Sequence, residues 1–182
     1  MFKNTKIMYL NDTTEEFRDA ISVLHEDCDL LIADIDFINL KKLHADCGND
    51  WGLVDHYDAL WASRHIFKQV RDVIRQEKPD IIISSGVSAA VLAKMNLEKV
   101  HTGPSIFISP LMTSIYGIKA IPGSIGRKCW WVYTKNDEKY LDEIKATAKS
   151  SSGSIAYADS RENPSPSVLE AIQDILYKIT QA

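Results

Sequence analysis

The chain has only three cysteines, Cys28, Cys47 and Cys129, and no two of them form a C-x-x-C pair. A disulfide framework needs an even set of closely spaced cysteines, so this pattern indicates free thiols in a reducing compartment. The first twelve residues contain neither the apolar stretch nor the small-residue cleavage site of a secretory signal. We therefore expect a cytoplasmic protein.

Long apolar runs and clustered positive charge are also absent. No run approaches the roughly 20 residues of a membrane-spanning helix, so we expect no membrane involvement. Lys and Arg number 21 against 25 Asp and Glu, which gives a formal net charge of -4. Nucleic-acid binders need clustered basic residues, whereas the densest basic stretch here, residues 135–149, is interleaved with acidic ones. We expect no nucleic-acid partner.

Signature loops for nucleotides and metals are missing. The sequence has neither G-x-x-x-x-G-K-[ST] nor G-x-G-x-x-G. Four acidic residues gather in the first third of the chain, but their spacing matches neither an EF-hand nor a zinc site: Asp46, Asp50, Asp55 and Asp58. We interpret this cluster as a solvated loop and expect no metal and no cofactor.

Apolar, β-branched segments alternate with segments of helical periodicity along the whole chain. Strands are predicted at residues 6–10, 29–35, 80–84, 105–109, 129–133 and 154–158. Helices are predicted at residues 17–24, 55–77, 89–96, 139–149 and 165–178. Residues 36–51 are expected to be a polar connection, and residues 113–127 an irregular excursion.

This alternation predicts a three-layer, doubly wound α/β domain of about six mostly parallel strands, in the order 2-1-3-4-5-6. No repeat or linker divides the chain, so residues 1–182 are expected to form one domain. Ligand chemistry should gather at the carboxyl ends of the strands, in the crevice between the first and third. A flavodoxin-like fold would alternate similarly, but Asn11-Asp12-Thr13-Thr14 is weakly suited to its phosphate loop.

The most informative segment runs Ile-Ile-Ile-Ser-Ser-Gly-Val-Ser-Ala-Ala-Val over residues 81–91. An apolar strand leads directly into Gly86-x-Ser88-x-Ala90 and then a helix, which is the context of a nucleophile elbow. Such a serine lies at a strained backbone angle and at a helix N-terminus, where N–H groups favour an oxyanion. The alternative is a tight turn in which Ser88 caps the helix.

At this segment the chain resembles the α/β-hydrolase superfamily, in particular its small, lidless members, and the resemblance covers most of the chain. Residues 107–110 are similar to the strand after the nucleophile helix. Residues 131–138 are similar to the strand and loop that carry the acid, which would be Asp137, although this residue could equally cap a helix. Residues 159–172 are similar to the histidine loop and closing helix. The resemblance implies a serine hydrolase of the esterase or acyl-hydrolase type, acting on a small-molecule substrate.

Two parts of the family's machinery differ in this chain. The family's order is Ser, Asp, His, but no histidine follows His101, and the histidine loop offers only Arg161, Glu162 and Asn163. The first-strand loop, often His-Gly in the family, reads Tyr-Leu-Asn-Asp over residues 9–12. A base would therefore have to come from elsewhere.

Topology ranks the remaining histidines. His56, at the start of a helix, and His44, after the second strand, are expected at the Ser88 edge of the sheet. His25 and His101 belong to the opposite edge, and His65 is in mid-helix. A helix N-terminus favours neutral imidazole, so His56 is preferred to His44 as the base. The alternative is that both are ordinary surface histidines.

Two functions of different classes follow. In the first, a serine esterase, Ser88 is the nucleophile, Asp137 the orienting acid and His56 the base. The backbone N–H groups of Ala89 and Asn11 then form the oxyanion hole. In the second, the chain is a catalytically inactive member of the fold that acts as a binding or interaction protein, as the missing histidine favours. Substrate and oligomeric state stay open.

Aromatic and apolar residues outside the predicted site leave further alternatives. Trp51, Tyr57 and Trp61 are interpreted as core residues that could instead line a pocket. Three residues of the irregular excursion could cover a pocket or form a dimer contact: Tyr116, Ile118 and Ile121.

Overall fold

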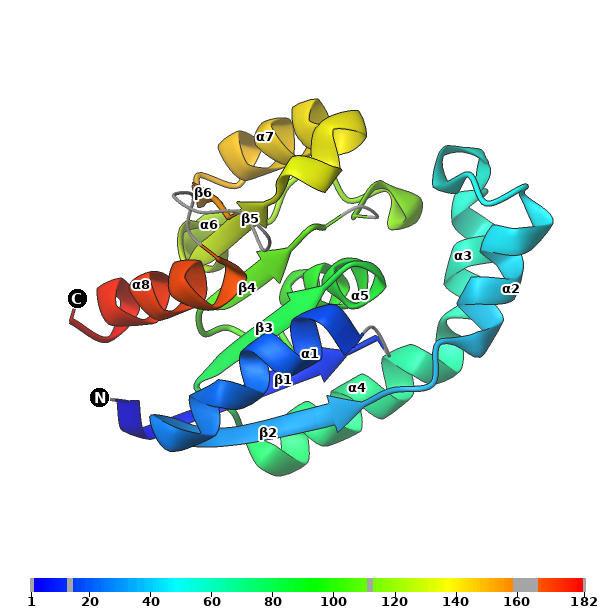
Figure 1. Ribbon diagram of the computed structural model, residues 1–182. Coiled ribbons are helices and arrows are strands. Elements are labelled where there is room, and N and C mark those ends of the chain that lie inside the picture. Colours follow the sequence, from blue (N-terminus) through cyan, green and yellow to red (C-terminus); the bar gives the residue numbers. More distant parts are fainter. Residues whose placement is uncertain (1, 13–14, 111–112, 159–166, 182) are drawn as a thin grey trace.

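The computed structural model describes residues 2–12, 15–110, 113–158 and 167–181 (Figure 1). Its six strands form one sheet in the order β2-β1-β3-β4-β5-β6, and every neighbouring pair is parallel. The strands are β1 (Phe2–Asn11), β2 (Cys28–Asp34), β3 (Ile81–Ser85), β4 (Ser105–Ile108), β5 (Cys129–Tyr133) and β6 (Ser154–Tyr157). The predicted strand order and directions are confirmed.

Alternate residues of each central strand enter two separate hydrophobic cores, because successive side chains of a strand point to opposite faces. On one face, Met8, Ile82 and Phe107 pack under α4 (Arg64–Glu77), α5 (Val87–Leu97) and α7 (Leu141–Ser150). On the other face, Ile7 and Ile83 pack under α1 (Glu15–Ser22) and α8 (Val168–Gln181). This is the three-layer architecture that the alternation predicted (Figure 1).

Two predictions about the segment after β2 are wrong. The expected polar connection contains a helix, α2 (Ile38–Asp46), in which Leu40 is the one buried apolar residue, so its periodic signal is weak. The expected long helix is two helices, α3 (His56–Ala62) and α4. They are separated at Ser63, a buried residue whose hydroxyl is hydrogen-bonded to the Tyr116 hydroxyl at 2.7 Å.

The expected irregular excursion contains two short helices, η3 (Thr113–Tyr116) and α6 (Gly123–Arg127). Tyr116, Ile118 and Ile121 are buried in the core on the α4, α5 and α7 side of the sheet, so they do not form an exposed contact surface. Three further short helices complete the described elements: η1 (Val23–Glu26), η2 (Trp51–Leu53) and η4 (Lys135–Tyr140).

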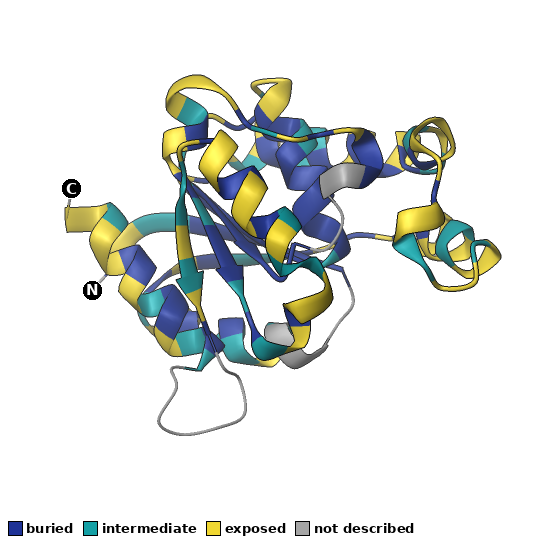
Figure 2. Ribbon diagram, turned by 90° about the horizontal axis from the view of Figure 1, so that it is seen from above, coloured by how far each residue is buried: buried dark blue, intermediate teal, exposed yellow. Residues whose placement is uncertain are grey.

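The helices α2 and α3 pack against each other beyond the carboxyl ends of the strands and project from the rest of the molecule (Figures 1 and 2). Tyr57 and Trp61 on α3 are 82% and 69% exposed, so the interpretation of these two side chains as core residues is wrong. No helix in the described ranges combines the length and the apolar character that crossing a membrane requires.

Candidate functional site

A single residue, Gly86, separates the end of β3 from the start of α5. Its backbone has φ +53° and ψ -118°, a conformation that residues with a Cβ adopt only under strain. Its N–H donates to the Ile108 carbonyl at 3.0 Å, and its carbonyl accepts from the Ala89 N–H at 3.2 Å. The chain therefore passes from buried strand to buried helix within one residue.

The residue at the strained apex of this turn is Gly86, two residues before the serine expected there. In a nucleophile elbow the apex carries the nucleophile. Here the small residues two before and two after the apex are Ser84 and Ser88, so the turn reads Ser84-x-Gly86-x-Ser88. Gly86 is partly exposed to solvent but has no side chain with which to react.

Ser88 lies inside the first turn of α5 and is fully buried. Its hydroxyl donates to the Leu10 carbonyl at 2.7 Å, and the Ser85 carbonyl is a second acceptor at 2.9 Å. The same hydroxyl accepts a hydrogen bond from the Ser85 N–H at 2.9 Å. These bonds join β1, β3 and α5. A nucleophile has to present its oxygen to a substrate, whereas the Ser88 oxygen is directed into the backbone of its neighbours.

The side chain of Asp12 occupies the space in front of Gly86. Asp12 follows the end of β1 and is only 3% exposed. A Cβ added to Gly86 would lie 2.9 Å from Oδ2 of Asp12, so this carboxylate lies where an apex side chain would begin. An ionised carboxylate also disfavours a second negative charge beside it, such as an oxyanion.

Asp137 is buried, and its Oδ2 accepts three hydrogen bonds. They come from the Ser109 hydroxyl at 2.8 Å, the Thr134 N–H at 2.7 Å and the Thr134 hydroxyl at 3.2 Å. Thr134 and Asp137 form a capping box at the start of η4, with Thr134 as the N-cap. Asp137 therefore helps to form the start of a helix, as the alternative to a catalytic role expected. It does so as the third residue of the first turn, whereas Thr134 is the cap.

The two candidate bases lie on the projecting helices. His56 is exposed at the start of α3, and its Nδ1 would be 3.4 Å from a Cβ added to Gly117. His44, on α2, stacks on the Trp51 ring with centroids 3.8 Å apart, and its Nε2 is buried with no hydrogen-bond partner among the described residues. Neither histidine is among the hydrogen-bond partners of Ser88 or Asp137 in the described part of the chain.

Ala89 and Asn11, whose backbone N–H groups are the predicted oxyanion donors, lie in the first turn of α5 and at the end of β1. The Ala89 N–H is already used within the helix turn, where it donates to the Gly86 carbonyl. Asn11 is buried at the end of β1, and its side-chain amide donates to Oδ1 of Asp34 at 2.6 Å. Arg161, Glu162 and Asn163, the remaining candidates from the histidine loop, lie outside the described residues.

At the carboxyl edge of the sheet, Asp12, Gly86 and Ser109 therefore follow β1, β3 and β4 directly, and Asp137 lies in η4 after β5. Sequence reasoning missed Asp12 and Ser109, although both follow predicted strands whose carboxyl ends meet at this edge. The described residues contain no group of three or more His, Cys, Asp or Glu side chains arranged to hold a metal ion.

Comparison of the chain with protein-family models, with curated proteins and with solved structures found no significant match. The candidate site is therefore interpreted from its own geometry.

Proposed function

We propose that this protein is a catalytically inactive, α/β-hydrolase-like protein that acts in binding or interaction. The observation that carries this proposal is the glycine at the apex of the β3–α5 turn. A turn of this shape exposes its central side chain at the carboxyl edge of the sheet, and Gly86 has none.

The surroundings of Gly86 support the same proposal. Acyl transfer by a serine enzyme needs an exposed nucleophile, a base within hydrogen-bond reach and donors for the oxyanion. Ser88 is fully buried, and the carboxylate of Asp12 fills the space at the apex. The carboxyl group of Asp137 is held by Ser109 and Thr134 instead of a histidine. The Ser88 hydroxyl and the Asp137 carboxylate, which catalysis would need, are therefore both engaged by structural partners.

A binding role fits the parts of the carboxyl edge that face solvent. The projecting arm leaves the sheet there, where α2 follows β2, and its returning helix α3 carries the exposed aromatic side chains of Tyr57 and Trp61. Because loops and insertions at this edge normally carry the function of a parallel α/β fold, a chain without a reactive centre still keeps a surface for recognition.

Labelling with a fluorophosphonate serine-hydrolase probe tests the proposal. Wild type and the Ser88→Ala variant should both remain unlabelled under conditions in which an active serine hydrolase reacts completely. Both proteins should also hydrolyse p-nitrophenyl acetate no faster than buffer alone. Circular dichroism on the same samples establishes that they are folded.

The serine-esterase hypothesis predicts the opposite result, namely that the probe labels the wild-type protein. Wild-type labelling that disappears in Ser88→Ala, with both proteins folded, would show that Ser88 becomes accessible and activated. That result would overturn the proposal, and the His56→Ala and His44→Ala variants would then identify the base.

A further inference from the structure

The two projecting helices form an exposed arm, defined here as α2, η2 and α3 (residues 38–62). Its large apolar side chains face solvent: Ile38 is 53% exposed, Leu53 69%, Tyr57 82% and Trp61 69%. Single exposed apolar residues are ordinary on a protein surface, but four on one projecting element make that element a candidate for recognition. Figure 2 shows how largely exposed this arm is beside the buried strands.

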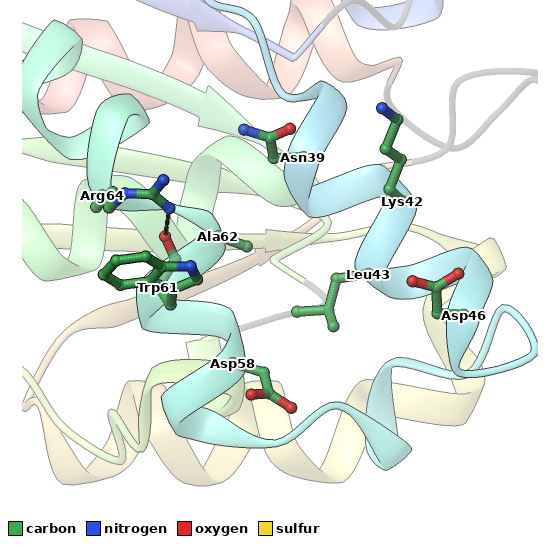
Figure 3. Close-up of a pocket in the computed structure, with 8 residues that line it drawn as sticks. All are labelled: Asn39, Lys42, Leu43, Asp46, Asp58, Trp61, Ala62 and Arg64. Carbon is green, nitrogen blue, oxygen red and sulfur yellow. Dashed lines mark hydrogen bonds between the residues drawn. The ribbon is translucent and has the colours of Figure 1, made fainter.

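A groove of about 410 Å³ lies between α2 and α3 (Figure 3). Leu43 and Trp61 contribute apolar surface to the groove. Arg64, the first residue of α4, lines the groove where the arm joins the rest of the molecule. The Arg64 guanidinium lies 3.9 Å from the centroid of the Trp61 ring and donates to the Trp61 carbonyl at 2.7 Å. Tryptophan, tyrosine and arginine are the residues that most often dominate the energy of protein interfaces.

The charges along this groove are separated by sign. The helix α2 runs outward to Asp46 and α3 returns from the outer end, so Asp46 and Asp58 lie toward the tip of the arm. Lys42 lies one turn before Asp46, and Arg64 lies at the root of the arm. Figure 3 shows both carboxylates toward one end of the groove and both cationic groups toward the other.

Three of these charged side chains have no ionic partner of their own. Within the described ranges, no ion pair uses Lys42, Asp46 or Asp58. Arg64 is held by the Trp61 carbonyl and ring, neither of which neutralises its charge. The groove therefore presents a basic end and an acidic end on either side of an apolar centre.

We propose that this arm is a self-association surface, on which a second copy of the chain docks across a two-fold axis. A two-fold interface uses the same surface on both copies, so that surface has to be complementary to itself. A groove with ends of opposite charge meets this requirement, because the rotation places the basic end of each copy over the acidic end of the other. Leu43 and Trp61 would then be covered at the centre.

This inference does not depend on the proposed function, since the arm would form the same surface whether or not Ser88 reacts. A partner with charge of a single sign would leave one end of the groove facing like charge. The separation of charge therefore favours a second copy over such a partner.

Sedimentation velocity measures the self-association directly. Dimer should become the main species at roughly 10–100 µM chain, the range of a weak association. Raising NaCl to about 0.5 M should weaken the association, since solvent-exposed charges are screened. Trp61→Ala should weaken it by about tenfold or more. Tyr177→Ala removes a side chain that is 50% exposed on α8 and serves as the matched control without effect.

Charge reversal tests the two-fold arrangement. Lys42→Glu with Arg64→Glu makes both ends of the groove acidic, and Asp46→Lys with Asp58→Lys makes both ends basic. Each double variant alone should be monomeric, whereas an equimolar mixture of the two should form a heterodimer. Circular dichroism verifies folding, and Trp61→Ala, at an exposed position, gives a second readout if a double variant unfolds.

Three outcomes would overturn the proposal. The first is a wild-type chain that stays monomeric to several hundred micromolar. The second is a dimer that Trp61→Ala and both charge reversals leave unchanged. The third is association that each reversal abolishes but that mixing the two variants does not restore.

Discussion

The carboxylate of Asp12 lies against the backbone of Gly86, so close that a Cβ at position 86 would be 2.9 Å from Oδ2. Asp12 follows β1 and Gly86 follows β3, and these neighbouring parallel strands bring the two residues together. The contact leaves no free space for a side chain at the apex of the turn, and it underlies the proposal that the site is inactive.

Gly86→Ala should lower the free energy of unfolding by about 2–4 kcal/mol, because it combines a positive φ with the collision at Asp12. Gly123→Ala is the matched control, since Gly123 also has a positive φ (+70°) but its added Cβ would meet no atom within 4 Å. It should cost only about 1 kcal/mol. Urea denaturation measures the unfolding free energy of both variants. The additional loss in Gly86→Ala should become smaller when Asp12 is also replaced by alanine. Equal losses at the two glycines would contradict this reasoning.

Ser88→Ala should destabilise the fold by about 1–3 kcal/mol, because it removes the hydrogen bonds of a buried hydroxyl to backbone groups of β1 and β3. Ser124→Ala, at an exposed position on α6, should change the unfolding free energy by less than about 0.5 kcal/mol. The urea midpoints of the two variants give the comparison. An unchanged midpoint for Ser88→Ala would mean that its hydroxyl has no structural role.

Stability should fall as the pH drops below about 6.5, the ordinary pKa of histidine. Burial, together with the charge of Lys128, lowers the pKa of His101 in the folded protein, and its Nε2–H donates to the Pro104 carbonyl at 3.0 Å. Between the lowered pKa and the ordinary one, the unfolded chain binds the proton and the folded chain does not, so acid favours unfolding.

His101→Gln should flatten this dependence of the unfolding free energy, measured by urea titration between pH 7.5 and 5. His65→Gln, at an exposed position on α4, should leave it as steep as in wild type. If the unfolding free energy of His101→Gln depends on pH as steeply as that of wild type, the acid sensitivity comes from other groups.

Cys47 should be the thiol that reacts first with Ellman's reagent in the native protein. Cys28 and Cys129 are buried, and desolvation raises their pKa to about 11 and about 12, so little of the reactive thiolate forms. Cys47→Ser should abolish the fast phase, and urea should expose the remaining two thiols. Fast labelling that persists in Cys47→Ser would be inconsistent with the burial of the other two.

The strands were predictable because each is a short apolar run between turn signals, and the parallel order followed from their alternation with helices. The helix α2 was missed because it buries only Leu40. The apolar periodicity continues across Ser63, so it gave no sign of the break there or of the hydrogen bond between Ser63 and the distant Tyr116 hydroxyl. The exposure of Trp61 could not be inferred either, since an aromatic residue at helical spacing usually faces a core.

The sequence by itself determined that an apolar strand would lead through Ser-Ser-Gly-Val-Ser into a helix, because strand and helix periodicity are local properties. Which of these residues takes the apex was decided by tertiary structure. Ser85 pairs with Ile108 of β4 and so remains in the strand, and Ser88 bonds to Leu10 of β1 from within the helix, which leaves Gly86 to make the turn. The carboxylate in front of it comes from position 12, and only the pairing of β1 with β3 brings Asp12 there.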